Sequence, residues 1–238
     1  MKSKIWLAGA LLLGQQMFGC DVVQAGVITA QGYTKAENSD IIQGEGLEWL
    51  AWSSTRGMSI SQALTKYQQD GWQLASNQQM AALMNKFQFG KQDWSDAEVL
   101  RQDKSVAWDA SESSPHLSFV SLFGRTVISP SCSELGRQSL CYLDNDRSNA
   151  SNAFFGSDQN KNGKYNSVYI ADDTSNYGFN GLVRTSHQAF IGYDIHPDTQ
   201  FDINVGVALV RTTNTVPAPA PLGLIGLMLI ALGLKRRR

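Results

Sequence analysis

Two apolar segments near the ends of the chain limit where a folded domain can lie. The first, Ile5–Leu13, follows two lysines and is too short to cross a bilayer as a helix. The second, Leu222–Leu234, has no polar side chain and is followed at once by a basic cluster. Between these ends lie roughly 190 residues, enough for one domain with a substantial core.

The N-terminal segment has the three parts of a secretory signal peptide. Lys2 and the apolar run are followed by Val23 and Ala25, small residues at the −3 and −1 positions of a signal-peptidase site. We therefore expect signal peptidase to remove residues 1–25, cutting between Ala25 and Gly26. A membrane anchor, a buried N-terminal helix and a lipoprotein cleavage site at Cys20 are the alternatives.

Cleavage at this site leaves two cysteines, Cys132 and Cys141. Export passes a protein through an oxidising compartment, where nearby thiols usually pair. We expect a disulfide that closes a short loop and contributes about 2–3 kcal/mol. Two free buried thiols are the alternative, because two cysteines alone do not complete a tetrahedral metal site.

The C-terminal region divides into a linker and an apolar span. Residues 212–221 hold three closely spaced prolines, which favour an extended chain. Residues 222–238 combine the apolar span with a basic stop, Lys235, Arg236, Arg237 and Arg238. As a helix the span would be about 20 Å long, so crossing a bilayer requires thinning or snorkelling. The basic stop would then be cytoplasmic; a buried C-terminal helix is the alternative.

The order of these parts resembles a known sorting signal. A short motif, Val216-Pro217-Ala218-Pro219, precedes a Leu/Gly-rich span and a terminal basic cluster, as in the PEP-CTERM signal of Gram-negative bacteria. This resemblance implies an exosortase that cuts near the motif in the inner membrane and passes the protein to the cell surface or outside. Many such proteins accompany exopolysaccharide. Ala218 stands where the family usually carries an acidic residue.

Residues 26–211 are expected to form one exported domain of the α+β class. Ser59 with Gln62, and Ser76 with Gln79, form capping boxes, and each is followed by apolar residues at helical spacing. We expect helices that end before Gly71 and Gly90, with a strand over Trp72–Ala75 between them. A weaker helical turn is expected from Ser95.

Beyond about residue 105, short apolar runs alternate with Gly, Asn, Asp and Ser, a pattern typical of strands. The expected strands are Leu117–Leu122, Arg125–Ile128, Leu140–Leu143, Val168–Ala171, Ala189–Tyr193 and Asn204–Arg211. Apolar residues face both sides of the last strand, which should be buried on both faces. Asp144–Lys164 is expected to be a long polar loop. Helices followed by strands indicate an α+β fold.

A second resemblance concerns this domain. Its landmarks are Gly46-Leu47-Glu48-Trp49, Gly71-Trp72-Gln73-Leu74-Ala75-Ser76 and Gly206-Val207-Ala208-Leu209-Val210-Arg211. They resemble the Lcl-type C-terminal domain, which is similar to C-type lectins: two helices, then an irregular antiparallel sheet with long loops. Gln73 replaces an Arg of the family pattern, and Ala75-Ser76 replaces Pro-Thr.

One sequence motif is typical of the start of a calcium loop. Asp158, Asn160 and Asn162 alternate before a glycine, but the twelfth position is a tyrosine, which cannot supply a bidentate carboxylate. Asp172 and Asp173, or Asp144 and Asp146, could complete a different calcium site, as loop carboxylates do in lectin-like domains. An Asn/Gly turn between strands is the alternative.

Aromatic and histidine residues give the remaining candidates. Trp94 and Trp108 stand among polar residues and are expected to be exposed and able to stack on sugar rings, whereas Trp49 and Trp72 are expected in the core. The three histidines, His116, His187 and His196, are widely spaced, and we interpret them as surface or structural residues. The sequence contains neither a Gly-x-Ser-x-Gly motif nor a glycine-rich phosphate loop.

The charge balance excludes one class of partner. The chain has 20 basic and 21 acidic residues, and because the two ends take six of the basic ones, the body is mildly acidic, unlike a nucleic-acid-binding domain. We expect a non-enzymatic exported protein that binds or organises exopolysaccharide, with no cofactor other than calcium. The alternatives are a carbohydrate-active enzyme on the same scaffold, with two carboxylates about 5–10 Å apart, and a purely structural surface protein.

Overall fold

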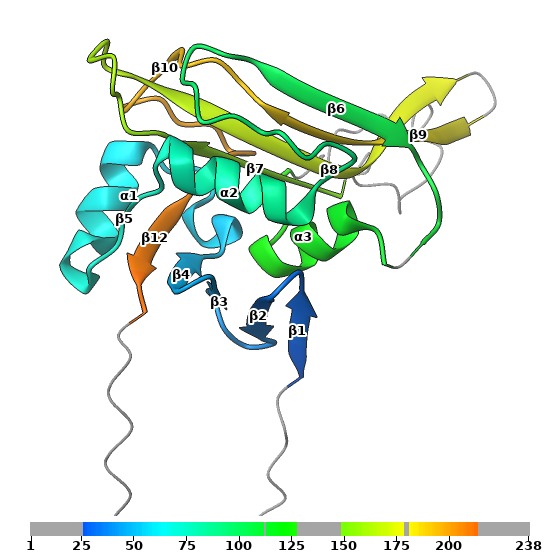
Figure 1. The fold of residues 1–238 in the computed structure, drawn as a ribbon, viewed down its shortest axis with the longest axis horizontal. Coiled ribbons are helices and arrows are strands. Elements are labelled where there is room, and N and C mark those ends of the chain that lie inside the picture. The colour runs from blue at the N-terminus through cyan, green and yellow to red at the C-terminus, as the bar shows by residue number, and fades with distance from the viewer. Residues whose placement is uncertain (1–25, 112, 128–148, 179–180, 214–238) are drawn as a thin grey trace, which may run out of the picture.

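The computed structural model describes residues 26–111, 113–127, 149–178 and 181–213 (Figure 1). These residues form an α+β fold with two sheets. The first sheet contains, in spatial order, β1 (Val27–Ala30), β2 (Tyr33–Ala36), β3 (Ile41–Gly44), β4 (Leu47–Leu50), β12 (Leu209–Thr212) and β5 (Gln73–Leu74). The second contains β11 (Gly206–Val207), β7 (Ala150–Phe155), β8 (Lys164–Gly178), β9 (Gly181–Ile191) and β6 (Gln102–Ala107), with β10 (His196–Pro197) paired to β8.

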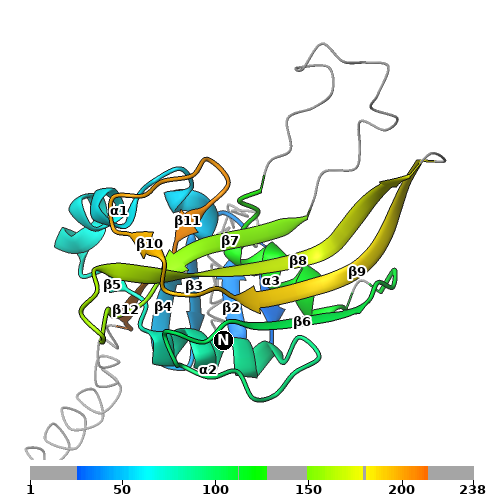
Figure 2. The ribbon, with the colours of Figure 1, turned by 90° about the horizontal axis from the view of Figure 1, so that it is seen from above.

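The helices α2 and α3 lie between the two sheets (Figure 1), whereas α1 lies at one end of them (Figure 2). The helical segments are η1 (Trp52–Thr55), α1 (Ile60–Tyr67), η2 (Gln68–Asp70), α2 (Asn77–Phe87) and α3 (Pro115–Phe123). α3 contacts β1 and β2 on one side and β7, β8 and β9 on the other. The main core therefore lies between the sheets, around a group of stacked aromatic side chains in which the Phe119 and Phe123 rings are 4.3 Å apart.

The capping boxes are confirmed. The Ser59 hydroxyl accepts a hydrogen bond from the Gln62 N–H (3.2 Å), and the Gln62 side chain accepts one from the Ser59 N–H (2.9 Å). Ser76 and Gln79 make the same reciprocal pair at the start of α2. The intervening strand is confirmed as β5. α2 ends at Phe87, before the expected glycine.

The expected strand over Leu117–Leu122 is wrong, because these residues lie in α3. Ser114 caps this helix by accepting a hydrogen bond from the Leu117 N–H (3.0 Å), and Pro115 occupies its first turn. The helix lies between two sheets and is apolar on most sides, so it lacks the 3.6-residue alternation that identifies an amphipathic helix.

Other expectations need smaller corrections. The described part of Arg125–Ile128 is not a strand, and Ser95 starts no helical turn, because the Gln102 side chain binds both its N–H and its C=O. Asp144–Lys164 is not all loop, since it contains β7. The helices do not come first: β1 to β4 precede α1, and their short, partly polar sequences carry little strand signal.

Several strand predictions are confirmed. Val168–Ala171 lies within β8, and Ala189–Tyr193 coincides with the end of β9 as far as Ile191. The last strand is buried on both faces, and it divides between the sheets: β11 pairs in parallel with β7, while β12 pairs antiparallel with β4 and β5. Because β12 ends at Thr212, the strand reaches one residue into the expected linker.

Some sequence predictions fall outside the described residues. These are the signal peptide (1–25), the cysteines Cys132 and Cys141, the strand Leu140–Leu143, the acids Asp144 and Asp146, and residues 214–238. Within the described ranges, none of the helices has both the length and the apolar character needed to cross a bilayer.

The packing of Gly206, in the part of the last strand that joins the second sheet, gives a testable prediction. A Cβ at this position would collide with the main-chain carbonyl of Trp52, which cannot swing aside as a side chain could. Gly206→Ala should therefore lower the free energy of unfolding by about 1–3 kcal/mol, measured by urea denaturation. As the control, Gly26→Ala should change it little, because its Cβ would meet the end of the exposed Glu37 side chain. Equal stability of both variants would contradict this packing.

Candidate functional site

A cavity of about 410 Å³ opens between the first sheet and α2. It is lined by Tyr33 of β2, Glu45 of the turn between β3 and β4, Leu47 and Trp49 of β4, and Gln79, Ala82, Asn85 and Lys86 of α2. Strand and helix geometry explain the set. Leu47 and Trp49 are two residues apart and share a face of β4. Gln79, Ala82 and Lys86 share a face of the helix, while the opposite face packs into the core.

Tyr33 and Trp49 form the floor of the cavity. Only 2% of Tyr33 is exposed, and its ring packs across Gly44, where any side chain would collide with it. The Tyr33 hydroxyl has no hydrogen-bond partner in the part of the chain that the structure describes. Burial, with a smaller effect of the nearby Glu45 carboxylate, raises the pKa of Tyr33 to about 12, so the hydroxyl keeps its proton. The Trp49 indole N–H is buried and also has no partner among the described residues.

The rim of the cavity is polar. Lys86 Nζ and Glu45 Oε1 form an ion pair at 2.7 Å, and their side chains are 44% and 56% exposed. The side-chain oxygen of Gln79 is held in the capping box, which leaves its amide N–H₂ without a partner within the described ranges. The Asn85 side chain already bonds the protein: it donates to the Trp94 C=O and accepts from the Trp94 N–H.

A smaller hollow of about 100 Å³ adjoins the cavity. Its lining residues are Leu47, Gly71, Gln73, Gln79, Val210, Arg211 and Thr212, so the two hollows share Leu47 and Gln79. The Arg211 guanidinium lies over the Trp72 ring at 4.4 Å, and its Nε donates to Glu48 Oε2 at 2.7 Å.

The tryptophans predicted to stack on sugars do not line this cavity. Trp94 is 3% exposed, so its expected exposure is wrong. Asn85 holds its backbone and Lys91 covers its ring at 5.3 Å, which buries an indole that the sequence places among polar residues. Trp108 is half-buried, with its ring 6.4 Å from that of His187. The core positions expected for Trp49 and Trp72 are confirmed.

The candidate calcium residues lie in the turn between β7 and β8. One side-chain oxygen of each accepts a hydrogen bond from the turn itself: Asp158 Oδ1 from the Gly163 N–H, Asn160 from the Asn162 N–H, and Asn162 from the Lys164 N–H. The Asn160 and Asn162 amides both donate to Asp194. Among the described residues, no group of three or more His, Cys, Asp or Glu side chains is placed to hold a metal ion. Calcium binding stays a prediction.

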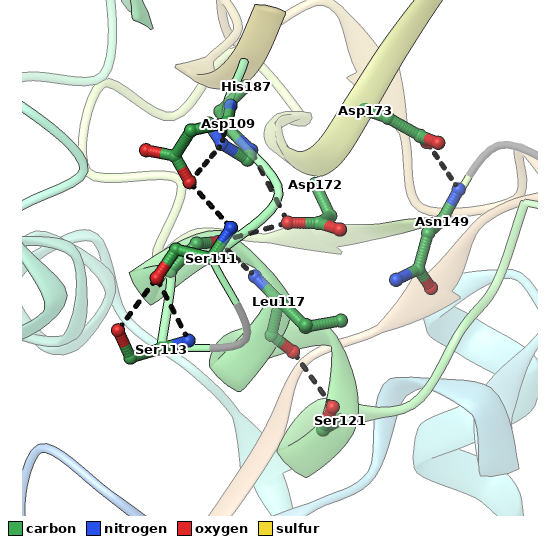
Figure 3. Close-up of polar contacts among 10 residues, drawn as sticks. Asp109, Ser111, Ser113, Leu117, Ser121, Asn149, Asp172, Asp173 and His187 are labelled. Atoms are coloured by element: carbon green, nitrogen blue, oxygen red, sulfur yellow. Dashed lines mark hydrogen bonds and ion pairs between the residues drawn. The ribbon is translucent and has the colours of Figure 1, made fainter. Parts of the chain in front are cut away.

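A buried polar cluster was not expected from the sequence (Figure 3). His187 Nδ1 lies 3.3 Å from Asp172 Oδ1, and His187 Nε2 accepts a hydrogen bond from the Asp109 N–H at 3.2 Å. Ser114 donates to the same Asp172 oxygen at 2.9 Å. The His116 ring stacks on that of His187, with centroids 5.0 Å apart. These residues come from distant parts of the chain, so no spacing pattern could reveal the cluster.

The geometry of this cluster suits a structural role. The main-chain N–H of Asp109 donates a hydrogen bond to His187 Nε2, the ring nitrogen that a catalytic histidine would present to a substrate. The contacts instead tie the segment after β6 to β8 and β9. His116 is only 1% exposed, and neither of its ring nitrogens has a partner in the described residues. Burial, and to a lesser extent the neighbouring His187, lowers the pKa of His116 to about 3.

This lowered pKa predicts a loss of stability in acid. Between pH 6.5 and pH 3 the unfolded chain binds a proton at His116 that the folded chain excludes, so the free energy of unfolding falls as the pH falls. The contribution should reach about 3 kcal/mol at pH 4. His116→Phe should remove it, giving a shallower pH dependence in urea denaturation, in addition to a difference that does not depend on pH because the unpaired ring nitrogens are removed. Parallel stability curves for the two proteins would show that His116 is not the responsible group.

Comparisons with known proteins do not assign the chain to a family. No protein-family model matches it, and neither the curated proteins nor the solved structures contain a match. Its function is therefore inferred from the geometry of the described residues and from the sequence patterns at its ends.

Proposed function

We propose that the chain is an exported surface or extracellular-matrix protein whose folded domain binds polysaccharide in the cavity between β4 and α2. The observation that carries this proposal is the pairing of apolar walls with uncharged hydrogen-bonding groups that have no partner among the described residues. Leu47 and Ala82 supply apolar surface, while Tyr33 and Gln79 supply a hydroxyl and an amide. Sugar rings have apolar C–H faces edged by hydroxyls, so they need this combination.

The proposal includes a C-type-lectin-like architecture. Two features support it: the helices α1 and α2 precede the β7–β8–β9 sheet, and the last strand, β12, returns to pair with β4 near the start of the domain. The proposed saccharide site lies between α2 and β4, and the turn that holds Asp158 does not line it. Binding in this cavity requires no metal ion.

The route of export is also part of the proposal. The signal-peptide pattern of residues 1–25 and the sorting pattern of residues 216–238 support secretion, a temporary inner-membrane anchor and release by an exosortase-like enzyme. Cell fractionation, with the mass of the mature C-terminus, tests this part separately. Processing near Pro217 would support it, and an intact Arg238 on protein recovered from the medium would contradict it.

Replacement of Gln79 tests the saccharide site. Gln79→Glu keeps an acceptor for the Ser76 N–H, so the capping box survives, but it removes the amide donor. Affinity for any saccharide found on a glycan array should fall about tenfold, as expected for loss of one hydrogen bond.

The matched control is Gln78→Glu, which adds the same charge at the exposed neighbouring position on α2. It should leave the affinity unchanged. Equal losses in the two variants would place binding elsewhere, and retention of no saccharide by the parent protein would refute the proposed function.

A further inference from the structure

We propose that the ligand is an uncharged, hydroxyl-rich chain lying along one groove that the two hollows form together. This inference rests on the proposed function and adds the charge and the length of the saccharide. Three observations carry it: the shared lining of the hollows, the pairing of their cations, and the neutral groups to which the described part of the chain offers no partner.

The two hollows adjoin each other, because Leu47 and Gln79 line both of them. From Lys86 to Gln79 the groove follows α2 for about 10 Å, at the helical rise of 1.5 Å per residue. Beyond Gln79 it follows β12 past Thr212 to Val210, about 7 Å at the rise of a strand. Figure 1 shows α2 beside β4 and β12, the elements that border this path. A groove of this length fits several units of a chain better than one small molecule.

Each cation along the groove already has a carboxylate partner. Lys86 pairs with Glu45 at 2.7 Å, and Arg211 pairs with Glu48 at 2.7 Å while it also donates to the Asp70 C=O and stacks on an indole. A polyanion would have to displace these carboxylates and would then lie against them. A polycation would meet the two basic groups in the same way. Neither charged class gains from this surface, whereas an uncharged chain leaves both ion pairs intact.

The groups left for a ligand are neutral. They are the Tyr33 hydroxyl, the Gln79 amide N–H₂ and the exposed Gln73 side chain, none of which has a side-chain donor bond within the described ranges. Hydroxyls and amides both donate to and accept from sugar hydroxyls. Because Tyr33 lies in the larger hollow and Gln73 in the smaller one, a chain must extend through both hollows to reach both groups.

The test compares three classes of oligosaccharide on the full chain in detergent by titration calorimetry. The probes are neutral hexose oligomers of two to six units, galacturonate oligomers of the same lengths and glucosamine oligomers. Neutral oligomers should bind more tightly as they lengthen to about four units, at least about tenfold more tightly than either charged class. Their affinity should change less than about twofold between about 50 and 500 mM salt.

Two substitutions locate the chain in the groove. Tyr33→Phe should weaken every neutral oligomer, and Gln73→Ala should weaken only those long enough to reach the smaller hollow. Tyr67→Phe is the control, since the Tyr67 hydroxyl bonds the Ser54 C=O and lies outside both linings. Melting temperatures of all variants show whether a loss reflects unfolding.

The outcomes separate this inference from the proposed function. Tighter binding of galacturonate, with a steep salt dependence that Lys86→Ala abolishes, would overturn the neutral-chain inference while saccharide binding stood. Affinity independent of length, or unaffected by Gln73→Ala, would overturn the continuous groove. Binding of none of the probes, together with an empty glycan array, would overturn both.

Discussion

The buried segment that joins the two sheets is the constraint on which the rest of the fold depends. Gly206 and Val207 pair with β7 in one sheet, and after Ala208 the chain enters β12 in the other. This crossing is possible because a glycine fits against the Trp52 carbonyl and because the buried Thr55 hydroxyl bonds both the N–H (2.7 Å) and the C=O (2.9 Å) of Val207. One short segment therefore satisfies its backbone groups in two layers at once.

The groove is a consequence of this crossing. β12 lies between β4 and β5, which places Arg211 opposite Glu48 and Val210 opposite Trp49. α2 is fixed above these strands by its apolar face, where Phe87 packs against Phe119 and Phe89 in the core. Its other face carries Gln79 and Lys86 over β4. Packing on one side of the helix thus determines which polar groups border the cavity on the other.

The parts of the fold that local chemistry determines could be predicted from the sequence. The two capping boxes fixed the starts of α1 and α2, and apolar residues on both faces identified the buried last strand. The sequence pattern did not reveal α3, because a helix between two sheets is apolar nearly all round and lacks the amphipathic 3.6-residue repeat. The cavity could not be predicted, since Tyr33, Leu47 and Gln79 come from three elements whose positions depend on tertiary packing. The exposure of Trp94 was wrongly predicted because Asn85, nine residues earlier on α2, binds its backbone and holds it in the core, a contact that the local composition does not reveal.

The location of the bound saccharide tests the central claim most directly, and hydrogen–deuterium exchange of the full chain with a saturating neutral oligosaccharide measures it. Binding in the groove predicts slower exchange in α2 from Gln79 to Lys86 and in β12 from Val210 to Thr212. The turn around Asp158 should exchange at an unchanged rate. Protection confined to that turn, with none in α2 or β12, would place the ligand at the other candidate site and contradict the account.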